Sequence, residues 1–137
     1  MILAIDYGSR YVGLAATDHE GRIPFRYGVI DQKKENVWEG IQDAIVKERI
    51  QKIIVGLPVN LEGEETAQTR ETQVFIDKLV VKVAPILVES VDETLTSVEA
   101  GRMIKAEGAS SHLEHAEAAR IMLEDYLRVQ KYIRAYG

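Results

Sequence analysis

The sequence predicts an α/β protein built on a mixed five-stranded sheet flanked by helices. Two features of the chain indicate this fold class. Its first third contains three short apolar segments separated by tight turns, which is typical of an antiparallel meander. The remainder alternates apolar segments of strand length with longer segments of helical periodicity, which is typical of parallel strands joined by crossover helices.

Three strands are expected at the N-terminal end, at residues 2–6, 11–18 and 24–31. The first connection contains Gly8 and the second contains Gly21. Connections this short bring consecutive strands together as antiparallel neighbours. The chain should therefore begin with a three-stranded antiparallel unit.

Helices and strands then alternate. Apolar residues recur with helical period from Asn36 to Ile50, which predicts a helix. Residues 52–58 are continuously apolar, which indicates a strand buried on both faces and paired in parallel. The other expected elements are a helix at 66–83, a strand at 85–90, and helices at 94–107 and 113–128. Three antiparallel strands followed by two parallel ones, with helices packed on them, form the layout of the ribonuclease-H-like fold.

Composition predicts a single domain covering residues 1–137. Hydrophobic residues make up 46% of the chain and charged residues 28%, as in ordinary globular proteins, and no linker divides the sequence. The lack of cysteine excludes disulfides, thiolate metal sites and a cysteine nucleophile. We recognise no signal peptide and no run long enough to span a bilayer, so we expect a cytoplasmic protein without a membrane partner.

The net charge of −5 argues against a generic nucleic-acid coat protein, which would normally be basic. It is compatible with an enzyme that acts on nucleic acid, because metal-binding carboxylates contribute to the negative total. Such an enzyme needs only a local basic rim. Residues that could supply it, or could equally be scattered surface charges, are Arg10, Arg22, Arg26, Lys33 and Lys34.

Possible metal ligands lie at the ends of three predicted elements. Asp6 ends the first strand, Asp92 and Glu93 follow the fifth, and His115 opens the last helix. In this fold these ends lie close together, and clustered carboxylates repel one another unless cations neutralise them. Mg²⁺ or Mn²⁺ suits oxygen ligands, and two such ions are the usual device for phosphodiester hydrolysis.

The same residues have structural interpretations. Asp6 could accept hydrogen bonds within the turn. Asp92 and Glu93 could cap the following helix and interact with its dipole. Glu114 and Glu117 could be solvated acids of a first helical turn, and this is our expectation for Glu117.

Four segments together resemble one protein family. They are IDYGSRYVGLAATD, IIVGLPVNLEGEETAQTRETQVFIDKL, VDETLTSVEA and HAEAARIMLEDYL, and they extend in this order to about residue 127. The second segment is the most specific. On these motifs the sequence resembles the YqgF/RuvX family of pre-16S rRNA nucleases, which are similar to Holliday-junction resolvases. The resemblance implies a ribonuclease-H-like fold, a cytoplasmic location and metal-dependent nuclease chemistry.

The resemblance implies catalytic roles for Asp6, Glu93 and His115, and metal coordination by these three residues and Asp92. His115 stands where the family pattern Asp-x-x-Ala-Ala has its aspartate. It could act as a ligand or a general base, or it could weaken or abolish activity. Thr94 replaces the arginine that follows the acidic pair in the family, which removes a candidate phosphate contact.

Four further residues are predicted to contact nucleic acid. Ser9 and Arg10 follow the first strand. Asn60 could bind phosphate or a base, or could belong to a plain turn. Arg70 could contact phosphate from the start of a helix, or could be an ordinary surface residue.

These observations leave three functional hypotheses. The first is a nuclease that processes the 5′ end of pre-16S rRNA during ribosome biogenesis. The second is a resolvase for four-way DNA junctions, which would require a dimer, and the sequence does not decide between monomer and homodimer. The third is a nucleic-acid-binding protein whose catalysis is lost at His115. An actin-like ATPase, suggested by IDYGS, is excluded by length, since those enzymes clamp nucleotide between two lobes.

Overall fold

The computed structural model describes residues 1–59, 62–93, 96–108 and 111–137. The strands are Ile2–Tyr7 (β1), Tyr11–Thr17 (β2), Pro24–Asp31 (β3), Lys52–Leu57 (β4) and Leu87–Asp92 (β5). The helices are Val37–Glu48 (α1), Ala67–Val83 (α2), Thr96–Glu107 (α3) and Glu114–Tyr136 (α4), with a short 3₁₀ turn at Ser111–Leu113. No helix in the described part of the chain is both long and apolar enough to cross a membrane.

The five strands form one sheet in the order β3-β2-β1-β4-β5. The pairs β1–β2 and β2–β3 are antiparallel, whereas β1–β4 and β4–β5 are parallel. This arrangement confirms the predicted mixed sheet with three antiparallel and two parallel strands. The carboxyl ends of β1, β4 and β5 therefore lie at one edge of the sheet.

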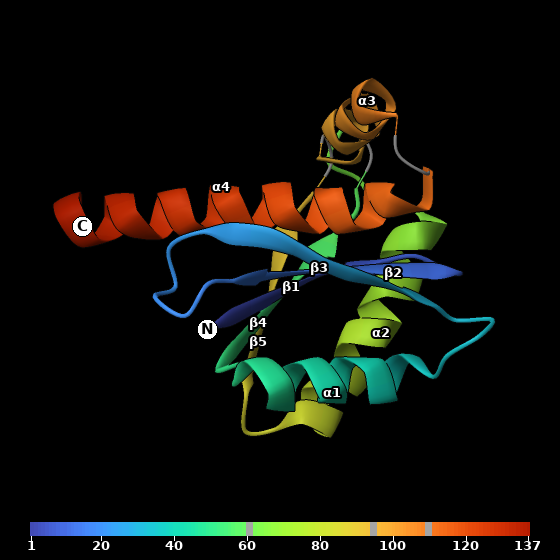
Figure 1. Ribbon diagram of the computed structural model, residues 1–137, viewed down its shortest axis with the longest axis horizontal. Helices are drawn as coiled ribbons and strands as arrows, with labels where there is room; N and C mark the ends of the chain where they lie inside the picture. The colour runs from blue at the N-terminus through green and yellow to red at the C-terminus, as the bar shows by residue number, and fades with distance from the viewer. Residues whose placement is uncertain (60–61, 94–95, 109–110) are drawn as a thin grey trace.

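Helices cover both faces of the sheet, with α4 on one face and α1 and α2 on the other (Figure 1). Because side chains alternate along a strand, Leu3 and Ile5 of β1 face α1 and α2 in the larger core, and Ala4 faces α4. Alanines dominate the strand side of the α4 layer, where Ala4 and Ala15 pack against Leu123. These small side chains let α4 lie close to the sheet.

Local signals fix the starts of two helices. The Asn36 side chain accepts hydrogen bonds from the backbone N–H groups of Trp38 and Glu39 and caps α1. Thr66 and Thr69 form a reciprocal capping box at the start of α2.

Several boundaries differ from the prediction, among them those of β5 and α4. The fifth strand, expected at 85–90, extends to Asp92 because Asp92 pairs with Leu57 of β4. The last helix, expected to end near Arg128, continues to Tyr136. No glycine or proline interrupts this segment before Gly137, and its residues are mostly good helix formers.

Candidate active site

Three elements bring a buried acidic site to one edge of the sheet. Asp6 lies on β1, one residue before the end of the strand, Glu93 directly follows β5, and His115 lies in the first turn of α4. We call these three residues the site cluster. The prediction placed Asp6 at the end of its strand, but β1 includes Tyr7, so Asp6 is a carboxylate inside a strand and is only 3% exposed.

Asp6 and His115 form a close pair. The Nδ1 atom of His115 lies 2.7 Å from Oδ2 of Asp6. This hydrogen bond raises the pKa of His115, and the burial of the imidazole only partly opposes it. The pair therefore favours an imidazolium whose Nδ1–H donates to Asp6, which leaves Nε2 as the ring nitrogen available to a substrate.

Glu93 is the second buried acid of the site cluster and is 4% exposed. Its Oε2 atom has no hydrogen-bond partner among the described residues. Burial, together with the neighbouring Asp6 and Asp92 carboxylates, raises the pKa of Glu93 to about 10. Without a cation, Glu93 is therefore protonated at neutral pH.

An unpartnered, buried carboxyl oxygen beside a second carboxyl group fits a divalent cation. Mg²⁺ and Mn²⁺ prefer oxygen ligands, and Mg²⁺ is often held by one or two carboxylates with water and substrate phosphates as its other ligands. Asp6 and Glu93 are the residues that could hold it. As they stand, the described residues contain no ready-made group of three or more His, Cys, Asp or Glu side chains that could hold a metal ion.

Asp92 differs from its neighbour Glu93. It is the last residue of β5, and its side chain is exposed whereas that of Glu93 is buried. Its negative charge still contributes to the raised pKa of Glu93. A metal-binding role for Asp92 stays a prediction.

Gly56 of β4 leaves room for the side chain of Glu93. A Cβ atom placed on Gly56 of β4 would lie 2.6 Å from Cδ of Glu93 and 2.9 Å from Sδ of Met122. The neighbour that requires a glycine here is therefore the Glu93 carboxyl group.

Another glycine lets the start of α4 lie against the sheet. A Cβ atom on Gly13 of β2 would overlap the backbone of His115 and Ala116. At Gly8 a Cβ atom would first meet the backbone oxygen of Tyr11, at 2.5 Å, and would also lie 3.0 Å from Cε1 of His115. The sequence analysis missed the role of Gly13. A glycine inside a strand is the signal that could have found it, because such a glycine often marks the close approach of another backbone.

The predicted nucleic-acid contacts are spread over the surface. Ser9 and Arg10 are exposed beside the site, and Arg10 pairs with Asp31 at 3.4 Å while lying 4.8 Å from the ring centre of Tyr11. Arg70 is exposed near the start of α2. Asn60 and Thr94 lie outside the described residues, so their predicted roles stay predictions.

Aromatic rings flank the site cluster, which the sequence analysis also missed. Tyr11 stacks on His112 with ring centres 5.4 Å apart, and its centre lies 6.5 Å from that of His115. Tyr7, next to Asp6, stacks on Phe75 at 4.2 Å. The alternation of apolar and polar residues along β1 and β2 does not reveal these ring contacts. The contacts depend on where the helices pack against the strands.

The expectation of a solvated Glu117 is wrong. Its side chain is 1% exposed and pairs with Arg120 on the same helix and, at 3.7 Å, with Arg26 of β3. Arg26 also pairs with Glu107 of α3 at 3.1 Å. Glu117 is buried because this side of α4 faces the sheet, so Arg26 joins three elements and is not free to form a basic rim.

Comparison with known proteins identifies the family. Residues 1–129 match the family model RuvX, which is described as "Holliday junction resolvase". Proteins from Phocaeicola vulgatus and Maridesulfovibrio salexigens, both named "Putative pre-16S rRNA nuclease", are 34% and 32% identical to the chain. These alignments cover 96% and 92% of this chain and 98% and 96% of the relatives.

Solved structures of RuvC from Thermus thermophilus share the fold. The structure in complex with a Holliday junction substrate has a TM-score of 0.58 and 14% identity, and covers 95% of this chain and 94% of that one. A second RuvC structure has a TM-score of 0.55, 14% identity and 95% coverage of both chains. These similarities confirm the ribonuclease-H-like fold predicted from the order of strands and helices. The chain belongs to the RuvX family.

Proposed function

We propose that this protein is a metal-dependent nuclease that hydrolyses phosphodiester bonds in structured RNA, with the 5′ end of pre-16S rRNA as its substrate. The observation that carries the proposal is the buried Asp6–Glu93 pair, with an unpartnered Glu93 oxygen, at the sheet edge where α4 delivers His115. The names of the relatives favour RNA as the substrate. The cytoplasmic location stays a prediction.

Asp6 and Glu93 would hold Mg²⁺ or Mn²⁺ through their carboxylate oxygens. When bound, such an ion supplies activation of the attacking water and charge stabilisation at the phosphate. Its positive charge would also offset the repulsion that keeps Glu93 protonated. Both acids are buried at the edge of the sheet where β1 and β5 end and α4 begins, and this supports the proposed metal site.

His115 would act through Nε2. Asp6 holds its Nδ1 and raises its pKa, so the imidazolium form is favoured. A protonated His115 can donate its Nε2 proton to the leaving oxygen as the P–O bond breaks, and water supplies the hydroxyl group that remains on phosphorus. Of the roles predicted for His115, this arrangement favours proton transfer over metal ligation, with His115 as the acid of the step.

Cleavage of a labelled pre-16S leader RNA in Mn²⁺ tests the proposal, with wild type compared with Asp6→Asn. Asp77→Asn, an exposed position on α2, is the matched control. We expect cleavage by wild type and the control and its loss in Asp6→Asn. Equal cleavage by all three proteins, or by none of them, would contradict the proposal.

A four-way DNA junction belongs in the same assay because the family description names a junction resolvase. Cleavage of the junction alone, by a dimeric protein, would favour that second function. Cleavage of the RNA alone would favour the first.

A further inference from the structure

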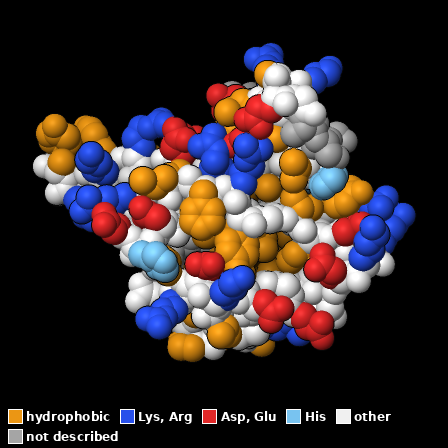
Figure 2. Space-filling view, viewed as in Figure 1, with side chains coloured by type: hydrophobic (Ala, Val, Ile, Leu, Met, Phe, Trp, Pro, Cys, Tyr) orange, Lys and Arg blue, Asp and Glu red, His pale blue; other side chains and the backbone are white. Residues whose placement is uncertain are grey.

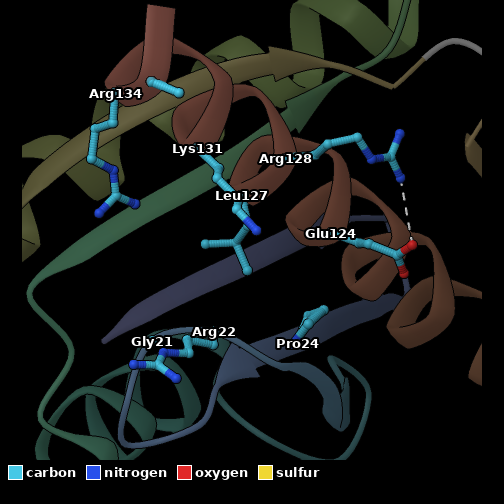
Figure 3. Close-up of a pocket in the computed structure, with 9 residues that line it drawn as sticks. Gly21, Arg22, Pro24, Glu124, Leu127, Arg128, Lys131 and Arg134 are labelled. Atoms are coloured by element: carbon cyan, nitrogen blue, oxygen red, sulfur yellow. Dashed lines mark ion pairs between the residues drawn. The ribbon is translucent and has the colours of Figure 1, made fainter.

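A second candidate surface lies at the other end of α4. A groove of about 780 Å³ separates the C-terminal half of α4 from the β2–β3 connection. We call it the α4 groove, and the lining residues used below are Arg22, Pro24, Leu127, Arg128, Lys131 and Arg134. Figure 3 shows Lys131 and Arg134 on one side of the opening and Arg22 on the other, with Leu127 between them and Pro24 to the right of Arg22.

The α4 groove is strongly basic although the chain carries a net charge of −5. Four of its nine lining residues are Lys or Arg, and Glu124 is its one acid. Glu124 is already paired with Arg120 at 2.8 Å and with Arg128 at 3.5 Å. Glu124 therefore pairs with arginines of its own helix and does not neutralise Arg22, Lys131 or Arg134.

Two of these cations have no counterion among the residues that the structure describes. Lys131 and Arg134 are exposed and form no ion pair with any residue in the described ranges. Arg22 forms an ion pair with Glu20 at 3.4 Å, and both side chains are largely exposed. Such a pair contributes little and is easily exchanged for a stronger anion. Figure 2 shows several Lys and Arg side chains near the projecting end of α4, with Asp and Glu side chains among them.

The apolar part of the groove matters as well. Leu127 and Pro24 are apolar residues that line the groove together with the cations. A sugar–phosphate backbone offers phosphates to the cations and less polar sugar carbons to these apolar residues, whereas a small inorganic anion would use only the charges. A groove of this volume, lined by four cations, fits the phosphates of a nucleic-acid chain.

The α4 groove is far from the site cluster but on the same helix. Lys131 follows His115 by sixteen residues, or about 24 Å along α4 at 1.5 Å per residue. A nucleic acid long enough to occupy both places would be positioned by the groove without any base being read.

We propose that the α4 groove binds the phosphodiester backbone of the RNA substrate about 24 Å from the bond that is cleaved. This inference rests on the proposed nuclease function for the identity of the RNA. Arg22, Lys131 and Arg134 contact phosphates, and Leu127 and Pro24 support the sugars.

The test measures RNA binding by the full chain in EDTA, which prevents metal-dependent cleavage. The probe is a labelled RNA stem-loop with a single-stranded leader, titrated at several salt concentrations. The groove variant combines Lys131→Gln and Arg134→Gln. The control combines Lys47→Gln and Lys78→Gln, which remove the same charge from exposed positions on α1 and α2, across the sheet from α4 (Figure 1). Thermal unfolding confirms that both variants are folded.

We expect the groove variant to bind the RNA roughly tenfold more weakly at about 0.1 M salt, with a salt slope reduced by about 2, or about 1 for each phosphate contact removed. The control should bind within twofold of wild type. Equal affinities for the groove variant and the control would overturn the proposal.

Cleavage of the same RNA by wild type in Mn²⁺ separates this inference from the proposed function. If the groove variant binds RNA more weakly and wild type cleaves no RNA, the result supports RNA binding in the α4 groove and contradicts the proposed nuclease function. If wild type cleaves the RNA and the groove variant binds it as tightly as the control does, the result supports the proposed nuclease function and overturns RNA binding in the α4 groove.

Discussion

His115 Nδ1 lies 2.7 Å from Asp6 Oδ2, and this contact joins the first strand to the last helix across 109 positions of the sequence. It makes His115 of α4 a hydrogen-bond partner of the acid on β1. The negative Asp6 raises the pKa of His115, so the charged form of the ring is favoured. His115 is therefore a group that can transfer a proton at this edge of the sheet.

The first prediction concerns His115→Gln. If His115 donates a proton to the leaving oxygen, its loss should slow RNA cleavage by about 10²-fold or more. Activity of wild type should fall as pH rises through the His115 pKa, which lies above its usual 6.5, because the acid form is needed. His115→Gln should lack this alkaline decline. Single-turnover rates across pH measure both effects.

The control for that prediction is His19→Gln, a change in the exposed β2–β3 connection. It should cleave like wild type and keep the alkaline decline. A His115→Gln variant with the full wild-type rate and pH profile would rule out proton transfer by His115.

The second prediction concerns stability and Glu93. The folded-state pKa of Glu93 is about 10, against 4.5 for an unperturbed glutamate. The folded state therefore binds more protons than the unfolded state between these values, and the free energy of unfolding should fall as pH rises from about 5. Thermal unfolding in EDTA at several pH values should show this decline, and Mn²⁺ should reduce it.

Glu93→Gln should flatten that pH dependence, since the amide does not titrate. Glu71→Gln, an exposed change on α2, should leave the decline in place. An equal pH dependence in Glu93→Gln and wild type would show that another group causes it.

The sheet was the most predictable part of the molecule. The short turns predicted the antiparallel pairing of β1, β2 and β3, and the continuous apolarity of β4 predicted its parallel pairing. The extent of α4 was less predictable, because its last two turns bury little and depend on helix propensity. Their apolar residues Val129, Tyr132 and Ile133 are at least half exposed.

For the candidate site, only the proximity of three residues was predictable. The ends of β1, β5 and α4 could be placed together from the fold, and this brought Asp6, Glu93 and His115 to one edge. The burial of Glu117 could not be predicted, because the first turn of a helix usually lies in water. It depends on Arg26, which is 91 positions away in sequence and reaches Glu117 only once β3 and α4 have packed.

The third prediction compares Gly13→Ala with Gly28→Ala. A Cβ atom on Gly13 would overlap the backbone of α4, whereas one on Gly28 of β3 meets no atom of the described residues within 4 Å. Gly13→Ala should destabilise the protein by about 3 kcal/mol or more, because α4 cannot approach the sheet as closely. Gly28→Ala should change the stability by less than about 1 kcal/mol. Urea unfolding measures both, and equal effects would contradict the close approach of α4.

The last prediction concerns the buried carboxylate of Glu117. Glu117→Ala leaves Arg120 and Arg26 without their buried partner and opens a cavity under α4, so we expect a loss of about 3 kcal/mol in the free energy of unfolding. Glu124→Ala breaks two ion pairs on the exposed side of the same helix and should cost less than about 1 kcal/mol. Urea unfolding of the two variants distinguishes them. Equal small losses would mean that Glu117 stabilises α4 no more than a surface acid does.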